Sequence, residues 1–162
     1  MKYDNLKRQA SLFSEYTELR GQRNSHARVS AVNGDIVSNV KSAQSGVSAR
    51  AFKNGVWGFA SSPEATDEAI ASTVQRASGN VRFLAQKAGA GLQQLPAFTG
   101  SGAYGSYNPA KNAEQKELLA FIKDLESYTA VKYPELQSRT FSLSVNDTER
   151  TMITSDGADA YT

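Results

Sequence analysis

Two Asn-Gly pairs, Asn33-Gly34 and Asn54-Gly55, restrict the folds open to this chain more than any other feature of its sequence. Each pair stands between runs in which apolar and polar residues alternate, most clearly in "HARVSAV" and "GVSARAF". Asn and Gly tolerate the positive φ angles that a two-residue hairpin turn requires. The pairs therefore predict antiparallel strands joined by tight turns.

Between these two turns, Ser45-Gly46 is expected to connect two further strands. We therefore predict four antiparallel strands that form a meander over residues 26–60. An amphipathic helix over residues 4–20 precedes them, because apolar residues recur there at helical spacing and Gly21 provides a stop.

Two more helices are expected after the meander. The first begins at Ser62-Pro63 or at Thr66-Asp67, which both offer a capping side chain, and it ends in the glycines that follow residue 88. A long loop rich in Gly, Ser and Tyr covers residues 89–108. Asn108-Pro109 then supplies a cap and a first-turn proline for the next helix.

The C-terminal part returns to strand patterns. The run "RTFSLSV" alternates, "NDTE" is expected to turn, "RTMITS" returns, and Asp156-Gly157 turns into one more strand. The fold class is therefore α+β, with an antiparallel meander sheet packed against two or three helices and followed by the start of a second antiparallel sheet. We assign residues 1–135 to an N-terminal α+β domain. Residues 136–162 are the first strands of a truncated β-rich region, so a fragment of a longer protein is expected.

Composition excludes several classes of function. Of the 162 residues, 40% are hydrophobic and 21% charged, which is typical of a soluble globular domain. No run suits a membrane helix or a secretory signal, and the lack of cysteine rules out thiolate chemistry and favours the cytoplasm. The net charge is only +2, and the densest basic run, with Arg20, Arg23 and Arg28, is typical of a solvated loop. Nucleic acid is therefore disfavoured as a partner.

The residues that catalysis needs are nearly missing. His26 is the single histidine, and its place at the start of a predicted strand is typical of a partly exposed strand residue. The run "GSGAYG" lacks the Lys-Ser/Thr ending of a phosphate loop, and no G-x-S-x-G motif is present. We therefore assign no catalytic residue and no metal ligand to this chain.

The segment "GVSARAFKNGVWGFASS", residues 46–62, holds the candidate contact surface. Gly58 leaves room for another backbone or side chain to approach, and Trp57 and Phe59 share one face of the predicted strand. Two interpretations stay open, because these rings either anchor the core against the helices or line a groove for substrate or a second subunit. The candidate contact residues are Arg50, Trp57, Gly58 and Phe59.

The segment "VNGDIVSNVKSAQSGVSARAFKNGVWGFASSPEATDEAI" resembles the N-terminal domain of the TldD/PmbA family, whose members are regarded as zinc metallopeptidases and were first called modulators of DNA gyrase. The likeness rests on the Asn33-Gly34 turn, the serine-containing stretch 42–45, the hairpin carrying Trp57-Gly58-Phe59, and the helix start at residues 66–69. The later run "TFSLSVNDTERTMITSDG" resembles a further strand pair of the family.

The family's His-Glu-x-x-x-His helix and metal-binding cysteine lie in its C-terminal half and are absent here, so no zinc ligand carries over. The resemblance implies a non-catalytic domain, inactive alone, from a parent that carries zinc in its C-terminal part or is the non-catalytic partner subunit. It also implies scaffold, dimer and substrate-chamber surface, in a homodimer or heterodimer that acts on peptides or unfolded small proteins. Peptide maturation is one such activity. The alternative is a stand-alone protein-binding module, for example a gyrase modulator, that works by edge-strand addition.

Overall fold

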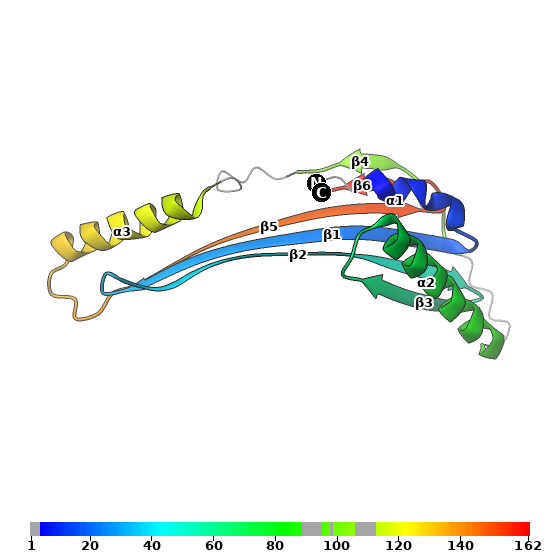
Figure 1. Cartoon of the computed structure of the whole chain (residues 1–162), viewed down its shortest axis with the longest axis horizontal. Helices are drawn as coiled ribbons and strands as arrows, with labels where there is room; N and C mark the ends of the chain where they lie inside the picture. The colour runs from blue at the N-terminus through cyan, green and yellow to red at the C-terminus, as the bar shows by residue number, and fades with distance from the viewer. Residues whose placement is uncertain (1–3, 89–94, 98, 106–112) are drawn as a thin grey trace. The chain divides into compact units, whose positions relative to one another are not determined.

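The computed structural model describes residues 4–88, 95–97, 99–105 and 113–162 (Figure 1). Its elements, in chain order, are α1 (Asp4–Arg8), the 3-10 helix η1 (Ala10–Leu12), β1 (Tyr16–Val32), β2 (Asp35–Lys53), β3 (Val56–Ser62), α2 (Asp67–Lys87), β4 (Ser101–Ala103), α3 (Gln115–Lys132), β5 (Thr140–Thr154) and β6 (Asp159–Tyr161). The strands form one sheet in the order β3-β2-β1-β5-β6-β4. The predicted α+β class, with an antiparallel meander packed against helices, is confirmed.

Both Asn-Gly turns are confirmed. Asn33 and Asn54 have φ angles of 48° and 50°, and Gly34 and Gly55 follow with φ angles of 91° and 82°. Two consecutive residues at positive φ define the turn that matches the twist of a hairpin. These turns join β1 to β2 and β2 to β3.

The link expected at Ser45-Gly46 is wrong, because β2 runs through it without a break. The meander therefore has three strands, not four. Gly46 does not form a turn but lets β2 lie close to the backbone at the end of β3. A Cβ atom at this position would lie 2.7 Å from the carbonyl oxygen of Ser62.

The C-terminal strands extend the same sheet and do not start a second one. The turn expected at residues 146–149 is wrong, because β5 continues through it. His26 of β1 lies beside Asn146 of β5, with 2.6 Å between Nδ1 and Oδ1. Strand pairing thus continues past a polar run that resembles a turn. The Asp156-Gly157 turn into β6 is confirmed, with a φ of 92° at Gly157.

The chain divides into two compact units. Unit 1 comprises residues 1–23, 44–105 and 148–162, and unit 2 comprises residues 24–43 and 106–147, as far as they are described. The domain boundary expected at residue 135 stays a prediction. None of the described helices combines the length and apolarity that a membrane crossing requires.

The helix expected over residues 4–20 is confirmed only at its beginning. α1 ends at Arg8, and β1 begins at Tyr16. The strand buries Thr17 and Leu19 completely, while Glu18 between them faces the other way. Pairing with β5 therefore outweighs the helical spacing of the apolar residues, and the Ser155 N–H donates to the Thr17 carbonyl.

In unit 1, α1 and α2 cover the same face of the sheet. α2 begins after Thr66, whose hydroxyl accepts from the Ala69 N–H at 3.2 Å, so the second of the two predicted helix starts is correct. Alternate residues of β2 meet this helix, as the alternation of "GVSARAF" predicts. The buried core consists of Leu6, Leu19, Val47, Ala49, Ala51, Ala60, Ile70, Val74, Ala77, Val81 and Ile153.

Gly58 allows α2 to approach the backbone of β3. A Cβ atom at this position would lie 2.4 Å from both the Ala77 carbonyl oxygen and the Val81 nitrogen. Real Cβ atoms do not come so close to backbone atoms. The sequence-based expectation that Gly58 makes room for another segment is confirmed, and that segment is α2.

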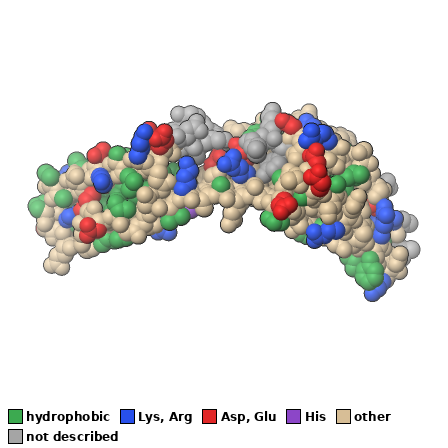
Figure 2. All heavy atoms as spheres, in the orientation of Figure 1, with side chains coloured by type: hydrophobic (Ala, Val, Ile, Leu, Met, Phe, Trp, Pro, Cys, Tyr) green, Lys and Arg blue, Asp and Glu red, His purple; other side chains and the backbone are tan. Residues whose placement is uncertain are grey.

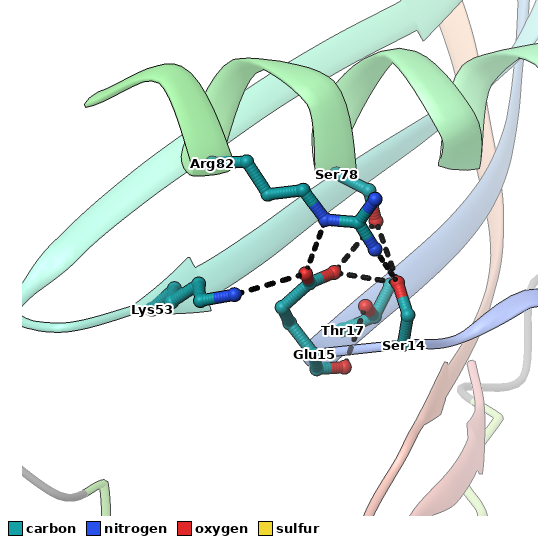
Figure 3. A network of polar contacts seen from close by, with 6 residues as sticks. All are labelled: Ser14, Glu15, Thr17, Lys53, Ser78 and Arg82. Atoms are coloured by element: carbon teal, nitrogen blue, oxygen red, sulfur yellow. Dashed lines mark hydrogen bonds and ion pairs between the residues drawn. The ribbon is translucent and has the colours of Figure 1, made fainter. Parts of the chain in front are cut away.

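Glu15 connects the segment before β1 to α2 (Figure 3). Its carboxylate accepts from Arg82 Nε at 2.6 Å and from the hydroxyls of Ser14 and Ser78 at 2.6 and 3.0 Å. Lys53 Nζ lies 3.6 Å away. Burial alone raises the pKa of Glu15, but the hydrogen bonds from Arg82, Ser14 and Ser78 outweigh it and lower the pKa to about 2.

In unit 2, α3 packs on β1, where Leu118 and Ile122 meet Val29 and Ala31. α3 begins at Gln115, and the Glu117 side chain accepts from the Glu114 N–H at 2.7 Å. The start expected at residues 108–109 lies outside the described residues. Several apolar side chains of this unit remain at the surface over α3, as Figure 2 shows. They include Phe121, Tyr128, Val131 and Tyr133.

We predict that Gly58→Ala destabilises unit 1 by about 2 kcal/mol or more, because α2 must move away from β3. Thermal unfolding followed by the fluorescence of Trp57, the single Trp of the chain, measures this effect. Gly79→Ala is the matched control in α2, where a new Cβ atom meets nothing within 4 Å. It should stabilise the helix by about 0.5–1 kcal/mol. Equal melting temperatures for wild type and Gly58→Ala would contradict the prediction.

We predict that Glu15→Gln removes an acid-sensitive part of the stability. The folded-state pKa lies below the ordinary value of 4.5, so the stabilisation is fully present above pH 4.5 and is lost as the pH falls towards about 2. The variant should lose about 1–3 kcal/mol at neutral pH and become less sensitive to acid. Urea unfolding at several pH values tests this, with the exposed Glu64→Gln as control. Parallel stability curves for wild type and Glu15→Gln would refute the prediction.

Candidate functional site

Three of the four candidate contact residues, Arg50, Trp57 and Phe59, lie on the face of the unit-1 sheet opposite α1 and α2, which we call the open face. Strand alternation places them there, because the residues between them belong to the core. In the described part of unit 1, both helices lie on the other face. The side chains of the open face include Tyr16, Glu18 and Arg20 of β1, Ser48, Arg50 and Phe52 of β2, Trp57 and Phe59 of β3, and Met152 of β5.

Arg50 is fixed by a two-point ion pair with Glu18 on the neighbouring strand. Its Nε lies 2.5 Å from Glu18 Oε2, and its Nη2 lies 2.8 Å from Oε1. The guanidinium also stacks over the ring of Trp57, 4.4 Å from the centroid. The hydrogen bonds to Glu18 raise the pKa of Arg50 above its ordinary value. Arg50 is therefore a permanent and well-oriented cation.

Trp57 is held by two further aromatic rings. Tyr16 meets it edge-on, with centroids 5.9 Å apart, and Phe52 lies at 5.1 Å. The Tyr16 hydroxyl donates to Glu18 Oε1 at 3.1 Å. Burial, together with the charge of Glu18, raises the pKa of Tyr16 to about 12. Tyr16 thus stays protonated and continues to donate this bond.

The interpretation of Trp57 and Phe59 as anchors of the core is wrong. Their side chains are 36% and 59% exposed, and Gly58 between them faces α2 instead. Phe59 lies directly opposite Arg50 in the strand register. The four candidate residues therefore separate, with Gly58 on the helix side and the other three together on the open face. Their contact with substrate or a subunit stays a prediction.

A shallow hollow of about 270 Å³ lies beside Arg50 on the open face. It is lined by Glu18, Arg20, Ser48, Arg50, Phe59 and Met152. Sequence reasoning missed Glu18, because the predicted helix extended over it. The assignment of Arg20, Arg23 and Arg28 to a solvated loop is wrong, because all three belong to β1. The alternation of Tyr16, Glu18 and Arg20 against Thr17 and Leu19 was the signal that could have found Glu18 and Arg20.

The other hollows differ in character. One of about 310 Å³ in unit 1 contains the Lys7–Asp159 ion pair. Another, of about 220 Å³ in unit 2, is lined in part by Glu126, which pairs with Arg139 at 2.8 Å through Oε1. Within the described residues, no group of three His, Cys, Asp or Glu side chains is placed to hold a metal ion.

The comparisons with known structures identify the fold. The chain superposes on TldE from Thermococcus kodakarensis with a TM-score of 0.65 and 14% identity, covering 97% of this chain and 35% of that one. Two proteins named as candidate modulators of DNA gyrase give similar results. The one from Thermotoga maritima has a TM-score of 0.72 and 14% identity, covering 98% of this chain and 36% of that one. The one from Bacteroides thetaiotaomicron has a TM-score of 0.69 and 12% identity, with the same coverage.

This chain thus spans about a third of the length of each of these proteins. No curated protein matches its sequence. A family model does match, over residues 17–81, and its description is PmbA/TldA metallopeptidase domain 1. These residues include both Asn-Gly turns, nearly all of β1, the whole of β2 and β3, and most of α2. The family model and the solved structures thus support the resemblance of this chain to the N-terminal domain of the TldD/PmbA family.

Proposed function

We propose that this chain is a non-catalytic domain that supplies scaffold and substrate-facing surface to a TldD/PmbA-like zinc metallopeptidase. The parent acts on peptides or unfolded small proteins, as a homodimer or with a related subunit, in the cytoplasm. The zinc ligands belong to its C-terminal part or to the partner subunit. The family match supports the parent's class, and the open face supports the role of this domain.

The exposed aromatic residues of the open face carry this proposal. A soluble domain rarely leaves large rings beside one another at its surface unless they contact something. Trp57 and Phe59 of β3 are both exposed, and the ion pair between Arg50 of β2 and Glu18 of β1 lies beside them on the same face of the sheet. An extended peptide can lay apolar side chains against such rings. Scaffold and binding surface are then two uses of one sheet, with the helices on one face and the peptide on the other.

We predict that an unfolded protein binds to the open face. The probe is reduced, carboxamidomethylated ribonuclease A, an unfolded chain without Trp, so that Trp57 alone reports binding. Its emission should change and saturate with the unfolded form but not with the folded form. Phe59→Ser should weaken binding about tenfold.

Phe83→Ser is the matched control for this experiment. Phe83 is 57% exposed, close to the value for Phe59, but it belongs to α2 on the covered side of the sheet. Its replacement should leave the affinity unchanged. An absence of saturable binding, or equal losses for the two variants, would overturn the proposed role of the open face.

We also predict that this chain does not cleave peptides by itself, because the described residues hold no group of side chains suited to bind zinc. The unfolded ribonuclease is incubated with the chain and excess zinc, and its products are analysed by mass spectrometry. The intact substrate mass should persist. New fragments that disappear on addition of a chelator would contradict the prediction.

The alternative, a stand-alone module that binds by strand addition, predicts main-chain pairing at the edge strand β3. Hydrogen exchange measured with the unfolded ribonuclease separates the two modes. Strand addition protects the backbone amides of β3, whereas side-chain binding on the open face leaves their exchange nearly unchanged.

A further inference from the structure

We propose that the hollow beside Arg50 recognises a carboxylate of the bound peptide, and that Arg20 is the residue that attracts it. This inference rests on the proposed function and specifies which peptides the open face prefers. The ligand group that the hollow recognises is a carboxylate next to an apolar side chain. The carboxylate comes either from an acidic residue within the peptide or from its C-terminus.

The charges around the hollow are unbalanced. The carboxylate of Glu18 is fully engaged, because each of its oxygens meets Arg50 and Oε1 also accepts from Tyr16. Arg50 and Glu18 therefore neutralise each other. Arg20 also lines the hollow but makes no ion pair within the described residues, and its side chain is exposed. One positive charge at the hollow is thus left without a counter-charge.

Two donor groups are available to a carboxylate in this hollow. Arg20 offers its whole guanidinium, whose planar fork suits both oxygens of a carboxylate. Arg50 uses Nε and Nη2 to bind Glu18, and its Nη1 makes no hydrogen bond within the described part of the chain. The stacking on Trp57 fixes the orientation of this group before a ligand arrives. Little conformational entropy is therefore lost at Arg50 on binding.

Apolar side chains flank these cations. Phe59 and Met152 line the same hollow, and Phe59 is 59% exposed. Met152 adapts to different partner shapes, because its side chain is unbranched and flexible. An acidic side chain with an apolar neighbour therefore fits the hollow better than a uniformly charged ligand. Arg150, two residues before Met152, shares its strand face by alternation and adds positive charge nearby.

These observations favour a peptide over a single-stranded nucleic acid. Binding of nucleic acid needs aromatic faces that are free for stacking with bases. The face of Trp57 is occupied by Arg50, and Tyr16 and Phe52 contact the same ring. The chain also carries a net charge of only +2. An oligonucleotide is therefore a competing outcome of the test, not part of the proposal.

The test uses capped peptides of about eight residues without Trp, in the extended form that a sheet surface accepts. One carries a central Glu between two Phe residues, a second has Gln in its place, and a third is the Gln peptide with a free C-terminal carboxylate. The fluorescence of Trp57 measures their affinities. The Glu peptide, the free-carboxylate peptide, or both should bind about fivefold tighter than the capped Gln peptide. The peptide that binds tighter identifies the source of the carboxylate, which is either an acidic side chain or the C-terminus.

Arg20→Gln should abolish this advantage, so that the variant binds the carboxylate-bearing peptides and the capped Gln peptide with equal affinity. Arg20→Lys should restore part of it, because the charge returns without the planar fork. Arg76→Gln, an exposed arginine of α2 on the covered side, is the matched control and should keep the full advantage. Circular dichroism confirms that each variant is folded.

The proposal fails if neither the Glu peptide nor the free-carboxylate peptide binds tighter than the capped Gln peptide, or if Arg20→Gln and Arg76→Gln behave alike. It also fails if oligothymidylate binds tighter than the Glu peptide and depends on Arg20, because the hollow would then belong to a nucleic-acid surface. If all peptides bind equally but Phe59→Ser still weakens their binding, only the carboxylate inference is overturned. Loss of all peptide binding would sink the proposed function as well.

Discussion

The contact between β3 and α2 at Gly58 decides which face of the unit-1 sheet is covered. Side chains alternate along a strand, so seating the helix over Gly58 directs Trp57 and Phe59 to the opposite face. Any side chain at this position would meet backbone atoms of the helix, which cannot swing aside as a flexible side chain can. The covered face and the exposed aromatic residues are therefore two consequences of one missing Cβ atom.

The ion pairing of charged side chains differs between the two faces of this sheet. On the helix side, the Glu15 carboxylate is nearly enclosed and meets Arg82 together with two hydroxyls, so its charge is compensated by donors of the protein. On the open face, Arg50 and Glu18 compensate each other as well, whereas Arg20 has no acidic partner among the residues that the structure describes. A buried charge must be paired for the domain to fold, whereas an exposed one costs little to leave unpaired. The unpaired cation therefore lies where a ligand can reach it.

The parts of the fold set by local chemistry could be predicted, and the parts set by pairing could not. The hairpin turns and the cap at Thr66 depend on a few adjacent residues, and each is where the sequence places it. Leu19 fits both a helical and an alternating pattern, and only pairing with β5 selects the strand. Of the candidate site, Arg50, Trp57 and Phe59 were singled out from the sequence because they lie on a clear hairpin, and their role in contacts stays a prediction. Whether their face is covered stayed open at that point, since alternation defines two faces without saying which one is covered.

The same helix that covers the sheet also limits how β3 can bind a partner. The Asn80 side chain of α2 donates to the Phe59 carbonyl oxygen at 2.8 Å. Strand addition requires free backbone groups along an edge, and this bond occupies one of them near the middle of a short strand. The ring of Phe59, in contrast, stays exposed on the open face. At this residue the backbone is engaged and the side chain is available, which favours recognition through side chains on the face of the sheet over pairing along its edge.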